Sequence, residues 1–344
     1  MKISTSLMNI LERSLSGIAP NREECIQLLS LQESSYEAAR LRGVADKITR
    51  QRFGNEAMLL GQIGIETFPC PANCKFCVFG EKHTHFPETK MTLDEIIEHA
   101  KAFTQDGNLH SLFLMLMHEF NFEEFLKTIK KIRQQIPAPA QIVVNMGDFD
   151  SVQAREMKDA GVSGAYHVRR LREGVDTGLD PQKRLETIGA IKEAGLDWYY
   201  CCEPIGPEHS PEELADQILL GLEYECFQHA AMRRVWLPDS PLGDRGQITE
   251  LRLAQVVAVV TLAMLENPAM RTIAVHEPNL IGLTSGANTV YAERGINPRD
   301  TKKDTANSRG LDHSACLKML WEAGFTALRR EPNETTPLTF DLIK

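Results

Sequence analysis

Three cysteines with short spacing are the residues in this sequence best suited to bind a metal cluster. Cys70, Cys74 and Cys77 form the pattern Cys-x3-Cys-x2-Cys. Thiolates bind iron strongly, and iron–sulfur clusters usually take four cysteine ligands. Three local ligands leave one iron open to an exchangeable ligand, and open positions are what catalytic metal sites keep. The spacing therefore predicts a 4Fe–4S cluster that takes part in chemistry.

Zinc is the alternative occupant of this loop. His83 and His85 follow Cys77 closely enough to complete a Cys3His site. The paired Cys-x2-Cys spacings that are typical of structural zinc sites are absent, which disfavours zinc. Chance clustering of cysteines in a loop is a third interpretation. The isolated cysteines elsewhere are expected to be buried small hydrophobic residues; they are Cys25, Cys226 and Cys316.

Reactive side chains also follow most of the other predicted strands. They are His118, Glu119, Asn145, Asp148, Tyr166, His167, Arg169, Cys201, Cys202, Glu203, Asp239, His276, Glu277, Glu293 and Arg294. In (β/α)8 proteins the active site lies at the carboxyl ends of the strands. The histidine and cysteine content of these positions exceeds what polar loops usually carry. We therefore expect these residues to surround one barrel mouth.

The elements that would position these residues follow from the hydrophobic pattern. Strands are predicted at 60–67, 111–117, 141–146, 164–168, 197–201, 234–237, 272–275 and 288–291. Helices are predicted between them at 92–104, 121–134, 150–159, 181–194, 210–224, 249–265 and 312–323. Strands that alternate with helices favour parallel βαβ units. The prediction is an α/β fold, a (β/α)8 TIM-type barrel, with an open doubly wound sheet as the alternative.

Two segments are predicted to lie outside the barrel. Residues 1–53 are helical in pattern and form an N-terminal extension that we expect to cap the bottom or the side of the barrel. The barrel itself is expected to span 54–328. The C-terminal tail, 329–344, is expected to be loosely ordered.

Composition narrows the classes of function. The chain has 344 residues, of which 42% are hydrophobic and 25% are charged, and a formal net charge of −9. An acidic chain lacks the basic field that attracts nucleic acid, so a nucleic-acid partner is not expected. No apolar run approaches the roughly 20 residues that span a bilayer. The first residues lack the features of a signal peptide, so we expect a cytoplasmic protein with no membrane partner.

The cysteine motif resembles the signature of the radical S-adenosylmethionine (SAM) superfamily. Phe76 precedes the last cysteine, and the motif follows the first predicted barrel strand. The resemblance implies that the open iron binds the amino and carboxylate groups of SAM. It implies that an electron from the cluster cleaves SAM to methionine and a 5′-deoxyadenosyl radical, which abstracts hydrogen from a substrate. An electron donor such as flavodoxin or ferredoxin is implied as a partner.

The same resemblance implies positions that bind SAM. His118 and Glu119 stand where many members have a Gly-Gly-Glu-like turn for the SAM amino group, although the alternative is a solvated pair at a helix N-terminus. Arg169 is expected to meet the SAM carboxylate, with Arg170 and Arg172 as alternatives. Ile205 resembles the start of the stretch that packs on adenine. The expected cofactor-binding set is His118, Glu119, Asn145, Arg169, Glu203 and Ile205.

Within the superfamily, the second half of the chain resembles the biotin synthase-like branch, which includes hydrogenase maturase and methylornithine synthase. The resemblance is carried by 184–188, 194–196 and 285–291. Biotin synthase uses an auxiliary 2Fe–2S cluster, but the ends of the second and third strands here have no cysteine. His276 stands where the arginine ligand is expected. We therefore do not expect an ordinary biotin synthase.

Cys201 and Cys202 raise the question of a second site. Neighbouring strand residues point to opposite faces, so both thiols could face the interior only if the strand has already ended. In that case both thiols and His276 could hold an auxiliary Fe–S cluster, or one thiol could be a sulfur or radical relay. The alternative is that neither cysteine is functional. The substrate is expected to contact His118, Asn145, His167, Cys201, Glu203, His276, Tyr291 and Arg294.

Three functions remain open at this point. The first is a radical SAM transferase that inserts sulfur into a small polar substrate, as in biotin or lipoyl formation. The second is a radical SAM enzyme that rearranges a carbon skeleton or assembles a cofactor. The third is a non-catalytic Fe–S or zinc-binding protein.

Overall fold

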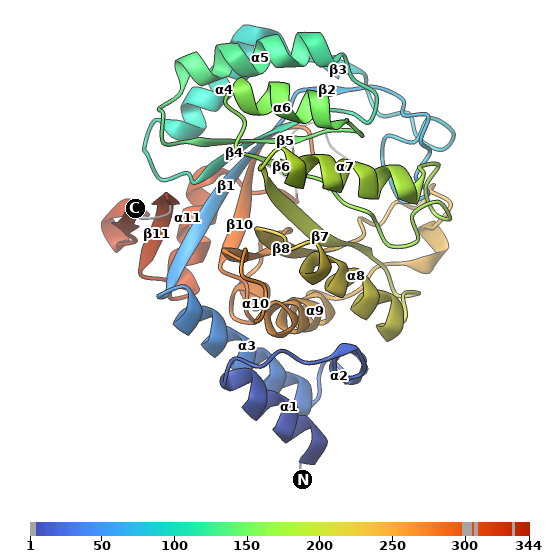
Figure 1. Cartoon of the computed structure of the whole chain (residues 1–344), viewed down its shortest axis with the longest axis vertical. Coiled ribbons are helices and arrows are strands. Elements are labelled where there is room, and N and C mark those ends of the chain that lie inside the picture. Colours follow the sequence, from blue (N-terminus) through green and yellow to red (C-terminus); the bar gives the residue numbers. More distant parts are fainter. Residues whose placement is uncertain (1–4, 298–304, 306–308, 332–333) are drawn as a thin grey trace.

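Eight parallel strands close into a barrel in the computed structural model, which describes residues 5–297, 305, 309–331 and 334–344 (Figure 1). The strands are β1 (Glu56–Gly64), β4 (Ser111–Met115), β5 (Gln141–Asn145), β6 (Gly164–Tyr166), β7 (Asp197–Ile205), β8 (Gln228–Arg233), β9 (Thr272–Val275) and β10 (Thr289–Gly295). They follow one another around the barrel in chain order, and β10 pairs with β1 from Met58↔Thr289 to Gly64↔Gly295. The predicted (β/α)8 architecture is confirmed.

Helices cover the outside of the barrel. They are α4 (Leu93–Thr104), α5 (Phe122–Gln135), α6 (Ser151–Asp159), α7 (Pro181–Glu193), α8 (Pro211–Glu223), α9 (Glu250–Ala263), α10 (Leu280–Leu283) and α11 (His313–Glu322). Capping side chains next to each helix fix where α4 and α7 begin. Thr92 and Glu95 form a capping box before α4, and Asp180 caps α7 with Pro181 in its first turn. Polar caps followed by apolar faces explain why these helix starts could be read from the sequence.

The lower part of the barrel interior is filled by aromatic rings. Phe113 lies edge-to-face against Tyr199 and Tyr291, with ring centroids 5.2 Å apart in each case, and 6.4 Å from Tyr166. Such pairs add to the stability that burial of the rings provides. A cavity lies above these rings, at the carboxyl ends of the strands.

Helices from the first part of the chain pack against the outside of the barrel. They are α1 (Thr5–Leu15), α2 (Arg22–Leu29) and α3 (Tyr36–Arg52). Helix α3 packs on α9 and α2 packs on α8, below the strands in Figure 1. The Thr49 hydroxyl donates to the carbonyl of Gly286 at 2.6 Å, and Arg52 donates to the carbonyl of Met264 at 2.7 Å. These contacts place the extension at the end of the molecule away from the cysteine loop.

The C-terminal segment is more ordered than expected. Strand β11 (Ala327–Glu331) pairs in parallel with the start of β1, and β12 (Glu334–Pro337) pairs with β11. The Arg329 guanidinium donates to Glu56 at 2.7 Å, which ties the segment to the first barrel strand. The expected loose tail is therefore wrong for the described residues 334–344.

The sixth barrel strand lies earlier than predicted. The apolar run 234–237 suggested a strand, but β8 is Gln228–Arg233 and Trp236 is 51% exposed in the loop that follows. The observed strand contains Gln228 and His229, whose side chains are fully buried and hydrogen-bonded to Tyr291 and to backbone carbonyls. Buried polar groups with partners weaken the apolar signal of a strand. Asp239 consequently lies well beyond the strand end and does not belong to the rim.

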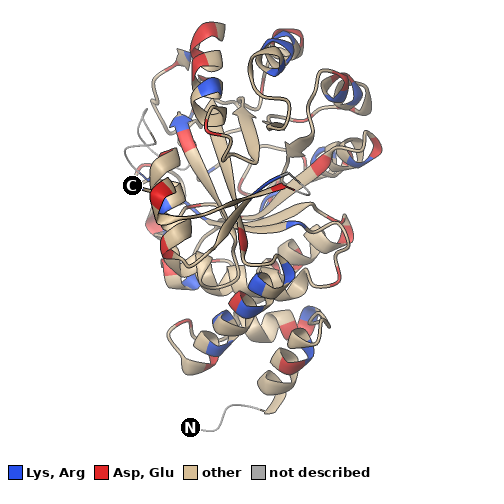
Figure 2. Ribbon diagram, turned by 90° about the vertical axis from the view of Figure 1, so that its left-hand side faces the viewer, with Lys and Arg blue, Asp and Glu red and all other residues tan. Residues whose placement is uncertain are grey.

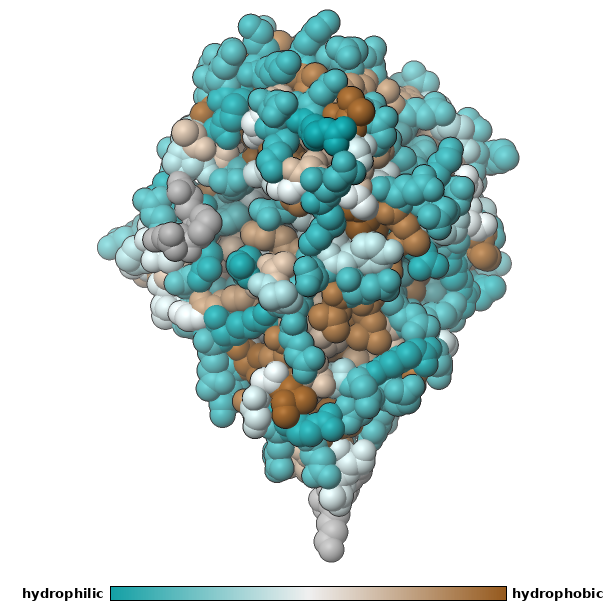
Figure 3. Space-filling view, in the orientation of Figure 1, coloured by the Kyte–Doolittle hydropathy of each residue, from teal (hydrophilic) through white to brown (hydrophobic). Residues whose placement is uncertain are grey.

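Charged side chains of both signs are interspersed along the outer helices (Figure 2). In the view of Figure 3 the surface is mostly hydrophilic, with hydrophobic patches around the places where α8, α9 and α10 lie in Figure 1. No helix among the described residues combines the length and hydropathy that crossing a bilayer requires.

Candidate active site

The cysteine loop connects two short strands, β2 (Glu66–Thr67) and β3 (Thr89–Lys90), above the mouth of the barrel. It is fastened to the segment between β6 and α7 by backbone hydrogen bonds. Lys75 N donates to Asp176 O at 2.9 Å, and Gly178 N donates to Ala72 O at 2.8 Å. A Cβ at Gly178 would lie 2.6 Å from the Ala72 oxygen, so only glycine allows this approach. The loop is thus held in place before any ligand binds.

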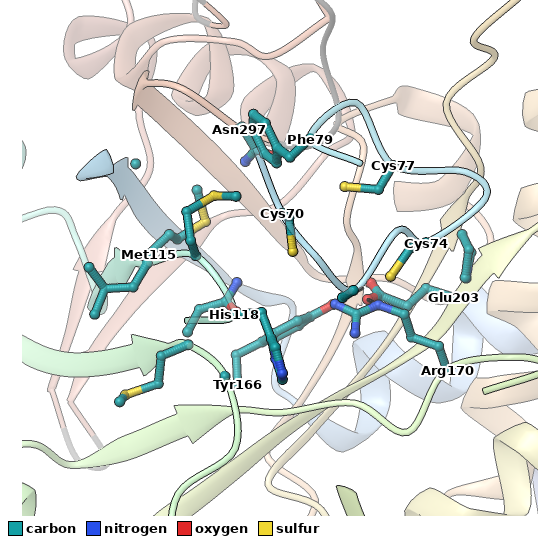
Figure 4. A pocket seen from close by; sticks show the side chains of 18 of the residues that line it. Cys70, Cys74, Cys77, Phe79, Met115, His118, Tyr166, Arg170, Glu203 and Asn297 are labelled. Atoms are coloured by element: carbon teal, nitrogen blue, oxygen red, sulfur yellow. Dashed lines mark hydrogen bonds and ion pairs between the residues drawn. The ribbon is translucent and has the colours of Figure 1, made fainter. Parts of the chain in front are cut away.

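The three thiols of the loop converge on one space (Figure 4). Burial raises the pKa of Cys70, the pKa of Cys74 to about 12, and the pKa of Cys77 to about 11. Backbone amides at Ala72 and Phe79 oppose this by hydrogen-bonding to the sulfurs of Cys70 and Cys77. Mutual proximity, thiolate chemistry and amide donors to sulfur fit an Fe–S cluster, whose iron charge would favour the thiolates.

A cavity lies between this loop and the strand ends. Apolar side chains form the upper wall of this cavity, and polar side chains form its floor. The lining comprises Gln62, Thr67, Cys70, Cys74, Cys77, Phe79, Met115, Met117, His118, Asn145, Met146, Tyr166, Leu179, Arg170, Arg184, Glu203, Pro204, Met232, Val235, His276, Ile296 and Asn297, among others. The predicted His118, Asn145, Glu203 and His276 are therefore brought together with the three cysteines.

Arg170 links the cysteine loop to the floor. Its Nε lies 3.4 Å from Glu203 Oε1, and Figure 4 shows the two side chains together below Cys74. Its side chain is 25% exposed, and that of Glu203 is 5% exposed. Burial opposes the charge of Arg170, but Glu203 and Glu173 outweigh it and hold its pKa above the ordinary value. A guanidinium at this position can meet a carboxylate in the cavity through its remaining N–H groups.

Arg169 was expected to meet the SAM carboxylate, with Arg170 and Arg172 as alternatives, and the structure favours Arg170. Arg169 does not line the cavity, and its carbonyl accepts from Gln217 of α8. Its Nε is buried without a hydrogen-bond partner among the described residues. After β6 the chain turns so that Arg170 points inward. The sequence could not show which of Arg169, Arg170 and Arg172 points into the cavity, because the three lie within four residues of one another.

The floor is built from side chains on β1, β6 and β7 and from His276, which directly follows β9. The Tyr166 hydroxyl donates to Glu203 Oε2 at 2.5 Å and lies 3.3 Å from His276 Nδ1. The Nε2 atoms of Gln62 and His276 are 3.3 Å apart. The His276 ring stacks on Tyr291, with centroids 4.3 Å apart. The floor is therefore a connected polar network over the aromatic core.

Cys201 and Cys202 lie on opposite faces of β7. The strand continues to Ile205, so side chains still alternate at both positions. Cys201 faces inward, where its sulfur and one ligand atom each of Glu203 and His276 lie within 4.8 Å of one another. Cys202 faces the helices with Tyr200, whose hydroxyl donates to Gln217 O at 3.1 Å. The hypothesis that both thiols serve one site is therefore wrong, and Cys202 is not part of the cavity.

Other predicted residues fall outside the cavity. Glu119 is exposed and faces a shallow depression beside the loop. Ile205 is buried in the core, while its neighbour Pro204 lines the cavity. Of the expected substrate contacts, His167 pairs with Asp148 at 3.3 Å, and Arg294 lies over the ring of Phe103. Tyr291 lies below His276 and does not line the cavity.

Sequence reasoning missed several lining residues. They include four methionines, Met115, Met117, Met146 and Met232, whose apolar side chains line the cavity. Gln62 was missed although a glutamine in an otherwise buried strand is a usable signal, because buried polar groups need a partner. Tyr166, in contrast, was among the residues expected at the barrel mouth, and it does line the cavity from the end of β6.

Glu277, next to His276, stabilises the rim through two arginines. Its carboxylate accepts from Arg233 at 2.6 Å and 2.7 Å and from Arg309 at 2.8 Å. Burial opposes its ionisation, but these arginines outweigh burial and lower its pKa to about 2. Ionised Glu277 thus stabilises the fold above its unfolded pKa near 4.5, and this contribution is lost as the pH falls through about 2.

Glu277→Gln is therefore expected to lower the free energy of unfolding at pH 7 by about 3 kcal/mol. The difference in the free energy of unfolding between the variant and the parent protein should shrink as the pH is lowered below about 4.5. Urea denaturation at a series of pH values measures this difference. Glu250→Gln is the matched control. Glu250 lies 3.4 Å from the same Arg233 but is 42% exposed, so a change below about 1 kcal/mol is expected. A pH-independent difference for Glu277→Gln would contradict the assignment.

Comparisons with known proteins agree with this geometry. Residues 67–217 match the family model described as the Radical SAM superfamily. The mitochondrial biotin synthase of Emericella nidulans is 24% identical over 303 residues, which cover 80% of this chain and 72% of that protein. The biotin synthase of Magnetococcus marinus is 23% identical over 332 residues, which cover 91% of this chain and 97% of that protein.

Two solved structures share the fold. Methylornithine synthase (PylB) superimposes with a TM-score of 0.78 at 18% identity, covering 94% of this chain and 97% of that one. The FeFe-hydrogenase maturase HydG from Carboxydothermus hydrogenoformans gives a TM-score of 0.75 at 15% identity, covering 93% of this chain and 78% of that one. At this identity the structures establish a common barrel.

Proposed function

We propose that this chain, which belongs to the radical SAM superfamily, abstracts hydrogen from a small molecule in the barrel cavity and completes the reaction without inserting sulfur. One observation carries the proposal. The three cysteines and the polar floor of Tyr166 and Glu203 face each other across a single cavity. A cluster on one side and hydrogen-bonding groups on the other form a chamber suited to a reactive intermediate.

Cys70, Cys74 and Cys77 would hold the 4Fe–4S cluster. When bound, the cluster supplies the electron that cleaves SAM to methionine and a 5′-deoxyadenosyl radical. Arg170 is placed to bind the SAM carboxylate, because its guanidinium lies next to the cysteines and keeps donors beyond those facing Glu203. His118 and Asn145 offer further polar contacts from the ends of neighbouring strands. A one-electron donor of the flavodoxin or ferredoxin class would reduce the cluster.

The lining favours a substrate with an apolar body and a polar head. Met115, Met117, Met146 and Met232 give an adaptable apolar wall. The floor offers a carboxylate at Glu203 and neutral donors and acceptors around it. A small molecule with a hydroxyl, amine or carboxylate group would place that group on the floor and its carbon skeleton against the methionines.

The thiol inventory argues against sulfur insertion. A cluster that serves as sulfur donor needs several protein ligands, and among the described barrel residues only Cys201 faces inward near the floor. The ends of β4 and β5, where the resemblance to biotin synthase would require cysteines, carry Met115 and Asn145 instead. A carbon-skeleton rearrangement or a cofactor-assembly step needs no such donor. Sulfur insertion is the second candidate, and the names of the biotin synthase relatives favour it.

Iron and acid-labile sulfide per chain separate the two candidates. On anaerobically reconstituted protein we expect about four irons, both in the parent and in the Cys201→Ala/Cys202→Ala double variant. The parent should form 5′-deoxyadenosine from SAM when reduced. Clearly more than four irons, with a return to four in the double variant, would instead establish an auxiliary cluster and make sulfur insertion the leading function. Zinc in place of iron would contradict the radical SAM proposal.

A further inference from the structure

Two side chains with weak O–H and S–H bonds lie side by side beneath the cavity, where the Cys201 thiol and the Tyr166 hydroxyl are hydrogen-bond partners. Tyr166 from β6 lines the floor, and Cys201 from the neighbouring strand β7 lies behind it, with no exposed surface. The sulfur of Cys201 is within 4.8 Å of donor atoms on Glu203 and His276, the same two residues that flank the Tyr166 hydroxyl. Phenol and thiol therefore share one hydrogen-bonded pocket at the end of the radical chamber.

This pocket keeps both groups protonated. Burial, and then the charge of Glu203, raise the pKa of Cys201 well above its ordinary value. Burial, together with the nearby carboxylate of Glu203, does the same to the pKa of Tyr166. The amide nitrogen of Gln62 can only donate, so His276 Nε2 accepts and the imidazole proton lies on Nδ1, facing the phenol oxygen. Tyr166 is thus fixed between a donor and an acceptor, with its own hydrogen intact.

We propose, on the basis of the function proposed above, that Tyr166 and Cys201 form a relay that returns a hydrogen atom to the carbon-centred radical left on the substrate. A phenolic O–H bond is weaker than an alkyl C–H bond, so the first transfer runs downhill. Phenolic O–H and thiol S–H bonds are similar in strength, so the second transfer is close to thermoneutral and is completed by reduction of the thiyl radical. Tyr166 would touch the substrate, and Cys201 would act through Tyr166. Tyr166 already lines the cavity, so a substrate radical on the floor can take the hydrogen that the hydroxyl otherwise donates to Glu203.

Each turnover of the relay uses one electron and one proton. The Tyr166 O–H bond breaks, a C–H bond forms on the product, and a tyrosyl radical remains. The Cys201 S–H bond then breaks, the Tyr166 O–H bond re-forms, and a thiyl radical remains on Cys201. One electron from a low-potential donor of the flavodoxin or ferredoxin class, and one proton delivered through Glu203 or His276, restore the thiol.

A divalent metal ion is the competing occupant of the same pocket. Cys201, Glu203 and His276 supply the sulfur, oxygen and nitrogen ligands that zinc or iron accepts. Glu203 already accepts from Tyr166 and pairs with Arg170, however, so the network is complete without a metal. The thiol would also have to lose the hydrogen that the relay uses. The two occupants therefore give different experimental results.

The test uses the reconstituted full-length enzyme and SAM in D2O, without substrate. Titanium(III) citrate serves as the reductant in buffer free of small thiols. The 5′-deoxyadenosyl radical is the probe, because it is released into the same chamber and must take a hydrogen atom from the protein. Hydrogens on Tyr166 and Cys201 exchange with D2O, whereas carbon-bound hydrogens do not. We expect one deuterium in the 5′-deoxyadenosine, measured by mass spectrometry.

Four variants identify the donor. In Tyr166→Phe the deuterium should fall to the natural-abundance level while 5′-deoxyadenosine is still formed. In Cys201→Ala the label should persist, and a tyrosyl radical should accumulate in the EPR spectrum because its reductant is gone. Tyr199→Phe and Cys202→Ala are the matched controls, a deeper tyrosine and the neighbouring cysteine on the outer face. Both should behave like the parent protein.

Several results would overturn the relay. Unlabelled 5′-deoxyadenosine from the parent protein, or full labelling in Tyr166→Phe, would place the donor elsewhere. A second bound metal that is lost in Cys201→Ala would show that the thiol carries no hydrogen. If the parent forms no 5′-deoxyadenosine at all, the proposed function fails, and this outcome is distinct from a product that forms without label.

Discussion

Replacing Cys74 by alanine is expected to abolish both the cluster and SAM cleavage. Only three protein ligands are available in the loop, and two thiols cannot retain a 4Fe–4S cluster with an open iron. Iron per chain should fall from about four to background, and 5′-deoxyadenosine to the level of a protein-free reaction. The measurements are iron analysis, the visible absorption of the cluster and chromatography of the SAM products.

Cys25→Ala is the matched control for this variant. Cys25 is a buried cysteine on α2, in the helical extension away from the cavity. Its removal should leave iron content and 5′-deoxyadenosine formation unchanged. If Cys74→Ala retained a full complement of iron, the cluster would have to be held by other residues, and the assignment of the loop would be wrong.

Replacing Arg170 by methionine is expected to weaken both the fold and SAM binding. The substitution leaves Glu203 without its nearby cation at the floor and removes a positive charge that acts on all three cysteines. An uncompensated buried carboxylate should lower the free energy of unfolding by about 3 kcal/mol, as measured by urea denaturation. The KM for SAM should rise by roughly 30-fold, because a charged donor to the SAM carboxylate is lost.

Two further variants separate the structural role of Arg170 from its proposed role in binding. Arg170→Met/Glu203→Gln removes both charges, so stability should largely return while the KM for SAM stays high. Arg169→Ala is the neighbouring control, because Arg169 lies outside the cavity. A high KM in Arg169→Ala, together with a normal KM in Arg170→Met, would restore the original prediction from the sequence.

The sequence alone predicted the fold class and the three cysteines proposed to bind the cluster, because both predictions depend on local patterns. Helix caps such as Thr92 and Asp180 and the apolar face of each helix depend on neighbours a few residues away. The three cysteines lie in one loop, so their spacing carries the chemistry without knowledge of distant contacts. Positions at the ends of strands were also predictable, and His118, Asn145, Glu203 and His276 do share one cavity.

Only the tertiary structure decided which side chain of each pair points inward. Arg169 and Arg170, or Cys201 and Cys202, are adjacent in sequence, and a shift of one residue moves a side chain to the opposite face. The answer depends on where β6 ends and how far β7 continues, which hydrogen bonds to neighbouring strands decide. The contact between Tyr166 and Glu203, and their approach to His276, join residues up to 110 positions apart. No local pattern encodes such a meeting, because closure of the barrel creates it.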